Sequence, residues 1–298
     1  MHKSFDTSIL KNSQVQYNIP MSEHISFRLG GNARTFVVLD ERDAPNALRK
    51  LAESGVKYAF LGNGTNVLVR DDGFDGVIIK LKSGAPQICG NCVTVSAGTQ
   101  LAVLAQACAE HSLTGLEFAH GIPGTVGGAV MMNAGAYGGE IRDVLVSTRY
   151  CTPEGEICTL RAEEHGFGYR TSFFKTHPEY LILSAEFELR QGNRDEIKNT
   201  MAELARRRRE SQPLDKPSAG STFKRPEGYF AGKLIEDCSL KGFTIGGAQV
   251  SQKHAGFVIN AGGATCSDVL ELCEHIQKPV SGRFGVMLER EIKILGEE

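Results

Sequence analysis

The run Gly121-Ile122-Pro123-Gly124-Thr125-Val126-Gly127-Gly128 is closely followed by Asn133-Ala134-Gly135-Ala136-Tyr137-Gly138-Gly139-Glu140, and these two runs are the best guide to how the chain folds. A helix is expected to begin near Val126 or Gly127. Glycines before a helix N-terminus let a diphosphate approach the backbone and present unpaired N–H groups to it. The first run lacks the Gly-Lys-Ser/Thr ending of a P-loop, so the pattern does not indicate nucleotide hydrolysis.

A second glycine loop, Gly62-Asn63-Gly64-Thr65-Asn66, lies between two apolar runs that are expected to be strands. This position separates it from the dinucleotide fingerprint, whose glycines open a helix. One interpretation is a plain hairpin turn. The other is a concavity of backbone N–H groups for phosphate oxygens, with Thr65 and Asn66 adding side-chain hydrogen bonds. Two such loops in one domain favour a bound dinucleotide over turns alone.

Composition narrows the class of protein. The chain has 298 residues, with 33 Lys+Arg against 35 Asp+Glu and a formal charge of −2, which argues against a dedicated nucleic-acid or membrane-surface protein. No apolar run is long enough to cross a bilayer, and the N-terminus lacks the order of a secretory signal. A cytoplasmic location with free cysteine thiols is therefore expected. The histidines show no metal-binding spacing, so no metal site is expected. Cys89 and Cys92 favour a β-turn over a metal or redox site.

The expected elements alternate between strands and helices. Residues 35–39, 56–61, 67–69, 77–81, 93–97, 144–151, 181–189, 256–260 and 286–295 are expected to be strands. Helices are expected over 41–54, 101–111, 193–210, 231–237 and 267–278. Alternation in the last strand would put Glu289, Glu291 and Lys293 on one face.

A few polar residues stand where chemistry is plausible. Arg170 could grip a carboxylate with two parallel bonds or form a surface ion pair. Ser221 has an approachable hydroxyl but no Gly-x-Ser-x-Gly elbow, and a turn or cap role is the alternative. Glu291 is either a solvated strand residue or an inward-facing proton carrier with a raised pKa.

Two basic features have similar alternatives. The run Arg206 to Arg209 is a solvated helix face or a source of positive charge for phosphates. His254 would reach a substrate phosphate or have only a structural role in its loop.

In this order, the motifs resemble the UDP-N-acetylenolpyruvoylglucosamine reductases, flavoenzymes of bacterial cell-wall synthesis. The similarity extends over nearly the whole chain, and no single piece carries it alone. It rests on residues 26–33, 62–66, 121–128, 133–140, 169–170, 219–221, 231–236, 246–248, 253–260 and the final Glu-x-Glu.

The resemblance implies an α+β fold. An FAD-binding region of the vanillyl-alcohol-oxidase type (PCMH) would comprise two α+β subdomains, at residues 1–78 and 79–192. A C-terminal α+β substrate domain would occupy 193–298. Non-covalent FAD would be held by the two glycine loops and the segment after them. This set is Gly62, Asn63, Gly64, Thr65, Asn66, Gly121, Ile122, Pro123, Gly124, Thr125, Gly127, Gly128, Asn133, Ala134 and Gly135.

The implied reaction is reduction of UDP-N-acetylglucosamine enolpyruvate to UDP-N-acetylmuramate, with NADPH as co-substrate. Hydride would pass from N5 of reduced FAD to the enolpyruvyl C3, and Ser221 would give the proton to C2. Arg170 and Glu291 would stabilise the enol intermediate. Further substrate contacts are expected from Tyr169, Lys224, Arg225 and His254. A cytoplasmic monomer that binds neither nucleic acid nor membrane is expected.

The chain departs from the family at three points. Met131-Met132 stands where an aromatic residue is frequent, and Arg225 where other members carry Asn. The connection from Arg170 to Leu181 is short, as in the subtype without the tyrosine-bearing loop. Two other functions are alternatives. One is a flavin-dependent oxidase of the same fold, and the C-terminal Ser and Glu motifs argue against it. The other is a binding protein that has lost catalysis.

Overall fold

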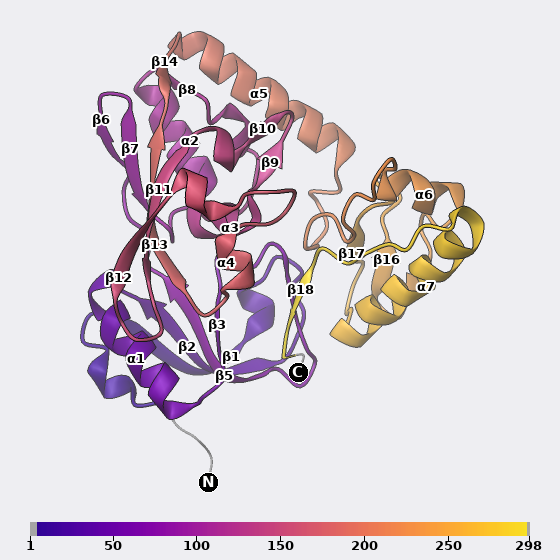
Figure 1. Ribbon diagram of the computed structural model, residues 1–298. Coiled ribbons are helices and arrows are strands. Elements are labelled where there is room, and N and C mark those ends of the chain that lie inside the picture. Colours follow the sequence, from indigo (N-terminus) through magenta and orange to yellow (C-terminus); the bar gives the residue numbers. More distant parts are fainter. Residues whose placement is uncertain (1–4, 297–298) are drawn as a thin grey trace. The chain divides into compact units, whose positions relative to one another are not determined.

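The computed structural model describes residues 5–296, which fall into two compact units, each built from segments far apart in the sequence (Figure 1). The first unit comprises the chain up to Tyr17 with residues 35–63 and 76–207. The second comprises residues 18–34, 64–75 and 208 onward. The three-part division expected from the sequence, with boundaries after residues 78 and 192, stays a prediction.

The first unit contains the larger sheets. Four strands, β1 (Gln14–Pro20), β2 (Asn32–Leu39), β5 (Phe74–Leu81) and β3 (Tyr58–Phe60), form one sheet in that order. A second, antiparallel sheet has the order β12-β11-β13-β7-β6. Its strands are β6 (Gln87–Cys89), β7 (Cys92–Ser96), β11 (Leu145–Cys151), β12 (Ile157–Arg161) and β13 (Leu181–Glu188). The first five residues of β13 are buried, as expected of a central strand.

Helices complete the first unit. In α1 (Ala44–Ser54) the buried residues Ala44, Ala47, Leu48 and Leu51 recur at helical spacing, and the helix ends at Gly55 with φ +61°. The others are α2 (Leu101–Glu110), α3 (Val126–Met132) and the short α4 (Phe173–Thr176). Small pairings join β9 (Gly135–Ala136) to β10 (Gly139–Glu140) and β8 (Leu113–Thr114) to β14 (Arg190–Gln191).

The second unit is built on short strands and two helices. The strands β15 (Thr244–Ile245), β16 (Ala248–Val250) and β17 (Val258–Asn260) form an antiparallel sheet. The helices are α6 (Ala231–Asp237) and α7 (Cys266–Phe284), and β4 (Val67–Val69) pairs in parallel with β18 (Lys293–Leu295). Asn260 joins distant segments here, because its buried amide donates to the carbonyl oxygen of Phe27 at 3.2 Å.

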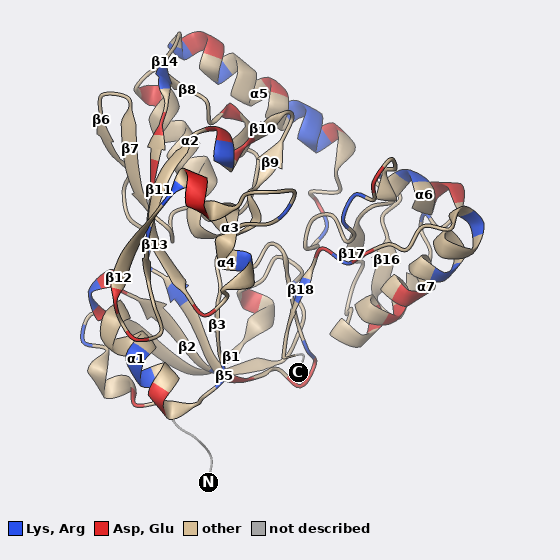
Figure 2. Ribbon diagram, viewed as in Figure 1, with Lys and Arg blue, Asp and Glu red and all other residues tan. Residues whose placement is uncertain are grey.

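The helix α5 (Arg194–Ser211) carries acidic and basic residues along its length (Figure 2). Arg206 and Arg207 both pair with Glu203 on the same helix, at 2.7 and 2.8 Å, and the two arginine side chains are exposed while Glu203 is half-buried. These pairs favour the solvated-face interpretation of the arginine run. No helix within residues 5–296 is both long enough and apolar enough to span a membrane.

The expected elements are largely confirmed, but several differ from the structure. The helix expected to end at Lys278 continues through Pro279 to Phe284, since Val280 on the same face is fully buried. The strand expected over 286–295 is wrong before Lys293, where only an isolated bridge joins Arg290 to Phe223. The strand expected over 56–61 covers only Tyr58–Phe60. The strands β1, β12 and β16 and the short helix α4 were not expected.

The hairpin interpretation of the first glycine loop is also wrong. The strand before it, β3, pairs with β5, whereas the strand after it, β4, pairs with β18. The expected turn at Cys89 and Cys92 is confirmed, because these residues are paired across the ends of β6 and β7.

Candidate functional site

The two glycine loops meet within the first unit. A Cβ atom on Gly62 would lie 2.5 Å from Oγ1 of Thr125, a separation that real Cβ atoms do not show. The side-chain amide of Asn63 donates to the carbonyl oxygen of Pro123 at 3.0 Å. Glycine at position 62 is therefore required for this approach, and Gly62 and Asn63 contact the second loop directly.

Helix α3 begins at Val126 as expected, but its N-terminus is not open. The N–H groups of Val126 and Gly127 donate to the carbonyl oxygens of Thr99 and Ala97, both at 2.8 Å. The Gly128 N–H donates to the capping hydroxyl of Thr125 at 3.3 Å. The expectation that these glycines present unpaired N–H groups is therefore wrong for the first turn of this helix.

The unbonded donors lie in the loops themselves. In the first unit, the backbone N–H groups of Asn63, Gly124 and Thr125 make no hydrogen bond within residues 5–296. The backbone N–H groups of Gly64 and Thr65, which belong to the second unit, make none there either. Backbone N–H groups in glycine loops are suitable donors for phosphate oxygens. The donors of the first unit, together with the close approach at Gly62, fit the diphosphate of a dinucleotide such as FAD.

The side chain of Asn133 is bonded within the protein. It ends α3 in a left-handed conformation, with φ +41°, and is buried. Its amide donates to Glu140 Oε2 at 2.7 Å and to the Gly168 carbonyl oxygen at 3.1 Å, while its Oδ1 accepts the Arg142 N–H at 3.1 Å. Both N–H donors of the side chain are thus used within the protein.

Arg170 lies in a tight turn. Gly168 and Thr171 bond to one another on either side of Tyr169 and Arg170, through N–H to carbonyl contacts of 3.2 and 3.4 Å. Arg170 has φ +56°, a conformation that side-chain-bearing residues rarely adopt and that clusters at functional sites. Its guanidinium carbon lies 5.3 Å from the centre of the Tyr169 ring. No sequence pattern indicated this backbone conformation.

Buried groups fix this turn on both sides. His165, before the turn, stacks on Phe167 with ring centres 4.7 Å apart. Its Nε2 lies 3.0 Å from Thr148 Oγ1 and its Nδ1 lies 2.7 Å from the Arg161 carbonyl oxygen. Burial lowers the pKa of His165, so the ring is neutral near pH 7. On the other side, the Ser172 hydroxyl donates to the Met131 carbonyl oxygen at 2.8 Å.

Ser221 and Glu291 are linked in the second unit through Thr222. The exposed Ser221 immediately precedes Thr222, which is fully buried. The Thr222 N–H donates to the Gly256 carbonyl oxygen and its own carbonyl oxygen accepts the Glu291 N–H, both at 2.9 Å. Thr222 therefore fixes the backbone beside both predicted catalytic residues.

Asn66, expected to contact the cofactor, holds the Glu291 segment. Its side-chain amide donates to the backbone carbonyl oxygen of Glu291 at 3.2 Å, and the backbone carbonyl oxygen of Asn66 accepts the Lys293 N–H at 3.1 Å. Ser26 supports the same region, because its hydroxyl donates to the Ser218 carbonyl oxygen at 2.6 Å and its N–H donates to that of Gly64 at 3.0 Å. The structure thus brings Asn66 and Glu291 together.

The other expected substrate contacts also lie in the second unit. Lys224 forms an ion pair with Glu289, and the Arg225 guanidinium carbon lies 3.9 Å from the centre of the Phe230 ring. His254 Nδ1 accepts the Gly256 N–H at 3.1 Å, and burial lowers the pKa of His254. A neutral His254 would offer a hydrogen bond rather than a positive charge to a phosphate.

Sequence reasoning missed the residues that support α3. Ala97 and Thr99 accept its first N–H groups, and a Cβ atom on Gly98 would lie 2.2 Å from the Leu81 carbonyl oxygen. Thr99 is fully buried, and its hydroxyl donates to the Gly84 carbonyl oxygen at 2.6 Å. The Ala-Gly-Thr sequence after a strand was the available signal, but it is too short to indicate this role.

Two family models match the chain. Residues 33–161 match a family model described as an FAD binding domain. Residues 212–295 match the C-terminal domain of UDP-N-acetylenolpyruvoylglucosamine reductase.

Individual relatives match almost end to end. The chain is 49% identical to the UDP-N-acetylenolpyruvoylglucosamine reductase of Clostridioides difficile, over 98% of this chain and 96% of that one. It is also 49% identical to the enzyme of the same name from Caldanaerobacter subterraneus, over 97% and 96% of the two chains. The crystal structure of the Thermus caldophilus reductase superimposes with a TM-score of 0.80 at 33% identity, covering 95% of this chain and 99% of that one.

The α+β fold with an FAD-binding region is confirmed by the family model and by the solved structure. Identity of this level over nearly the full length of both chains also confirms the family expected from the motifs. The chain belongs to the UDP-N-acetylenolpyruvoylglucosamine reductase family.

Proposed function

We propose that this chain reduces the enolpyruvyl group of UDP-N-acetylglucosamine enolpyruvate, giving UDP-N-acetylmuramate for peptidoglycan synthesis. FAD is its cofactor and NADPH its co-substrate. The observation that carries the proposal is the linkage of Ser221 and Glu291 through buried Thr222, inside the region that matches the family's C-terminal domain.

The two glycine loops hold the cofactor. The unbonded N–H groups of Asn63, Gly124 and Thr125 would bind the phosphates, and Gly62 permits the contact between the loops. Bound FAD supplies the hydride that NADPH delivers. Because the donors are neutral, the protein needs no basic surface for this ligand, in keeping with its formal charge of −2.

Each predicted catalytic residue has one task. Arg170, always cationic, neutralises charge that develops on the substrate carboxylate. Glu291, when protonated, donates a hydrogen bond to the enol oxygen. Ser221 gives its proton to C2 and, because a hydroxyl is a weak acid, requires a positioned partner or water to recover it. Tyr169, Lys224, Arg225 and His254 contact the rest of the substrate.

The wider assignments belong to the same proposal. Residues 193–298 form the substrate domain, and the protein acts as a monomer in the cytoplasm without binding nucleic acid. Since the connection from Arg170 to Leu181 is short, a segment other than a tyrosine-bearing loop covers the substrate.

Replacing Ser221 separates the two halves of the reaction. In Ser221→Ala, NADPH still reduces the flavin at the wild-type rate while turnover falls at least about 100-fold, the lower range for loss of general acid catalysis. Ser221→Cys, which keeps a donor, recovers part of the turnover. Equal loss of both steps in Ser221→Ala would show that Ser221 shapes the site and does not donate the proton.

A further inference from the structure

Cys89 and Cys92 face each other at the tip of a β-hairpin. Cys89 ends β6, Cys92 begins β7, and the two are register partners around the two-residue turn Gly90-Asn91. Gly90 has φ +59°, which suits the first central position of such a turn. The residue after β13 contacts this turn, because the Leu189 N–H donates to the Asn91 carbonyl oxygen at 2.9 Å.

This pairing places the two side chains within reach of a disulfide. Directly opposed residues of an antiparallel pair project from the same face, with Cα atoms about 4.5–5.5 Å apart. Disulfides join residues whose Cα atoms are about 4.4–6.8 Å apart. The bond can therefore form without a change of register. It requires a small closing movement at the hairpin tip, because opposed Cβ atoms lie about 4.5–5.5 Å apart and those of a disulfide about 3.5–4.5 Å.

Exposure distinguishes this pair from the other cysteines. All eight cysteines lie within the described residues, and only Cys89 and Cys92 are exposed. Burial raises the pKa of Cys108 and Cys273 to about 12 and that of Cys151 to about 11. Since the thiolate is the reacting form, these buried thiols are inert toward reagents in solution.

A metal site is the less favoured use of the pair. Closed zinc sites take four ligands, and two thiols at a hairpin supply half of that number. Within residues 5–296 there is no group of three or more His, Cys, Asp or Glu side chains that could hold a metal ion.

We propose that Cys89 and Cys92 are a reversible thiol–disulfide modification site that exchanges with low-molecular-weight disulfides. One thiolate attacks the reagent, forms a mixed disulfide and releases one thiol. The second thiolate attacks the protein sulfur of that mixed disulfide and releases the other thiol. The pair gives up two electrons and two protons, and the reagent takes them up as two thiols. Because the bond closes a very short loop, it adds little stability to the fold.

The test uses the purified full-length protein with its FAD, exposed to oxidised glutathione without denaturant. Intact mass and peptide mapping report the products. The wild type is expected to lose two hydrogens, to contain a Cys89–Cys92 disulfide, and to return to the starting mass with dithiothreitol. Cys89→Ser and Cys92→Ser are each expected to stop at a stable glutathione adduct on the remaining cysteine. Cys158→Ser, a control at a half-buried cysteine, is expected to behave as the wild type.

Three results would overturn the proposal: stable glutathione adducts on the wild type without an internal disulfide, a disulfide that uses other cysteines, or no reaction at all. The readout is covalent mass, so each outcome is independent of the proposed reductase activity.

Discussion

The side-chain amide of Asn133 donates a hydrogen bond to the backbone carbonyl oxygen of Gly168 at 3.1 Å. Asn133 ends α3, the helix that follows the second glycine loop, and Gly168 begins the turn that carries Arg170. One buried side chain thus fixes the turn of a predicted catalytic residue to the helix beside the predicted cofactor loop. Asn133 acts here as a positioning residue.

Asn133→Gly tests this link. Glycine accepts the left-handed backbone of position 133, so the variant removes only the side chain. The Gly168 carbonyl and the Glu140 carboxylate then lose a buried donor, at an expected cost of about 1–3 kcal/mol in the free energy of unfolding. We expect turnover to fall while flavin reduction by NADPH is retained, as measured by steady-state and stopped-flow assays.

Asn18→Gly is the matched control. Asn18 also has a positive φ, of +53°, but it is exposed, and its side-chain oxygen accepts a hydrogen bond from Asn32 at the surface. The variant is expected to change stability and turnover little. If Asn133→Gly kept full turnover, Asn133 would have no positioning role.

Gly62→Ala tests the contact between the glycine loops. Its Cβ atom would collide with Thr125 Oγ1, which caps α3 by accepting the Gly128 N–H. The loops must separate, so we expect the flavin-to-protein ratio of the purified variant to fall well below that of the wild type. Absorbance after dialysis measures the ratio.

Gly282→Ala is the corresponding control. Gly282 lies within α7, and a Cβ atom added to it would have open space around it. Alanine there should retain the flavin and raise stability by about 0.5–1 kcal/mol. A flavin ratio unchanged in Gly62→Ala would contradict the loop contact.

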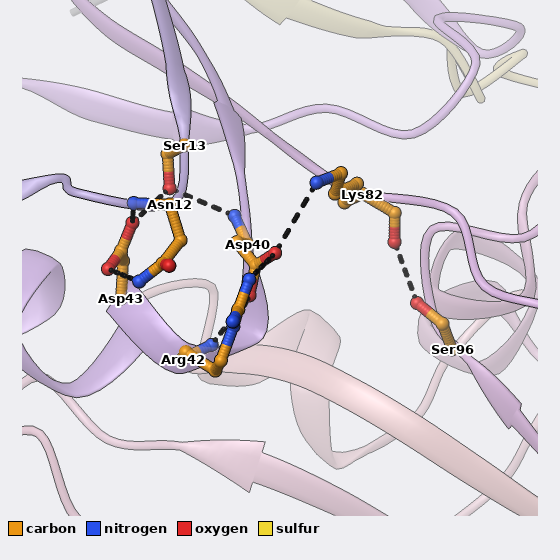
Figure 3. Close-up of polar contacts among 7 residues, drawn as sticks. All are labelled: Asn12, Ser13, Asp40, Arg42, Asp43, Lys82 and Ser96. Atoms are coloured by element: carbon orange, nitrogen blue, oxygen red, sulfur yellow. Dashed lines mark hydrogen bonds and ion pairs between the residues drawn. The ribbon is translucent and has the colours of Figure 1, made fainter.

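Acid sensitivity is expected from the carboxylates near the start of α1 (Figure 3). Asp43 is buried and accepts hydrogen bonds from the Asn12 N–H at 2.8 Å and the Ser13 hydroxyl at 2.6 Å. Burial alone would raise the pKa of Asp43, but the hydrogen bonds from Ser13 and Asn12 outweigh it and hold the pKa below its ordinary value. At Asp40, chiefly the side-chain hydrogen bond from Arg42 lowers the pKa.

A pKa lowered by folding gives stability that is fully present above the unfolded value, about 3.9 for Asp, and is lost as pH falls through the folded pKa. Asp43→Asn should therefore be less stable than the wild type at pH 7, by about 1–3 kcal/mol, and should lose less stability below about pH 4. Denaturant unfolding across pH measures both. Glu53→Gln is the control, because Glu53 forms an exposed ion pair with Lys50. Its free energy of unfolding should match that of the wild type across the same pH range. Parallel pH curves for Asp43→Asn and the wild type would rule out this role of Asp43.

Local pattern was a good guide where one segment determines its own structure. The apolar run of β13, the periodicity of α1 and the turn at Cys89 and Cys92 were all predicted and are confirmed. The pairing of β4 with β18 was not predictable, because it joins strands far apart in the chain. Helix α7 passes Pro279 because tertiary burial of Val280 offsets the local cost of proline.

The candidate site shows the same limit. Glycine, Asn and Ser motifs indicated which loops matter, but not which donors remain unbonded. The first N–H groups of α3 donate to the carbonyl oxygens of Ala97 and Thr99. The side-chain amides of Asn133 and Asn66 donate to backbone carbonyl oxygens of other segments. These partners come from distant segments, so only the folded chain reveals them.

An anaerobic half-reaction decides whether the chain carries out the proposed reduction. The protein is reduced with NADPH until the flavin absorbance is bleached, and UDP-N-acetylglucosamine enolpyruvate is then added. We expect the oxidised flavin spectrum to return and UDP-N-acetylmuramate to form in an amount equal to the flavin. A flavin that stays reduced after the substrate is added would contradict the proposed reaction.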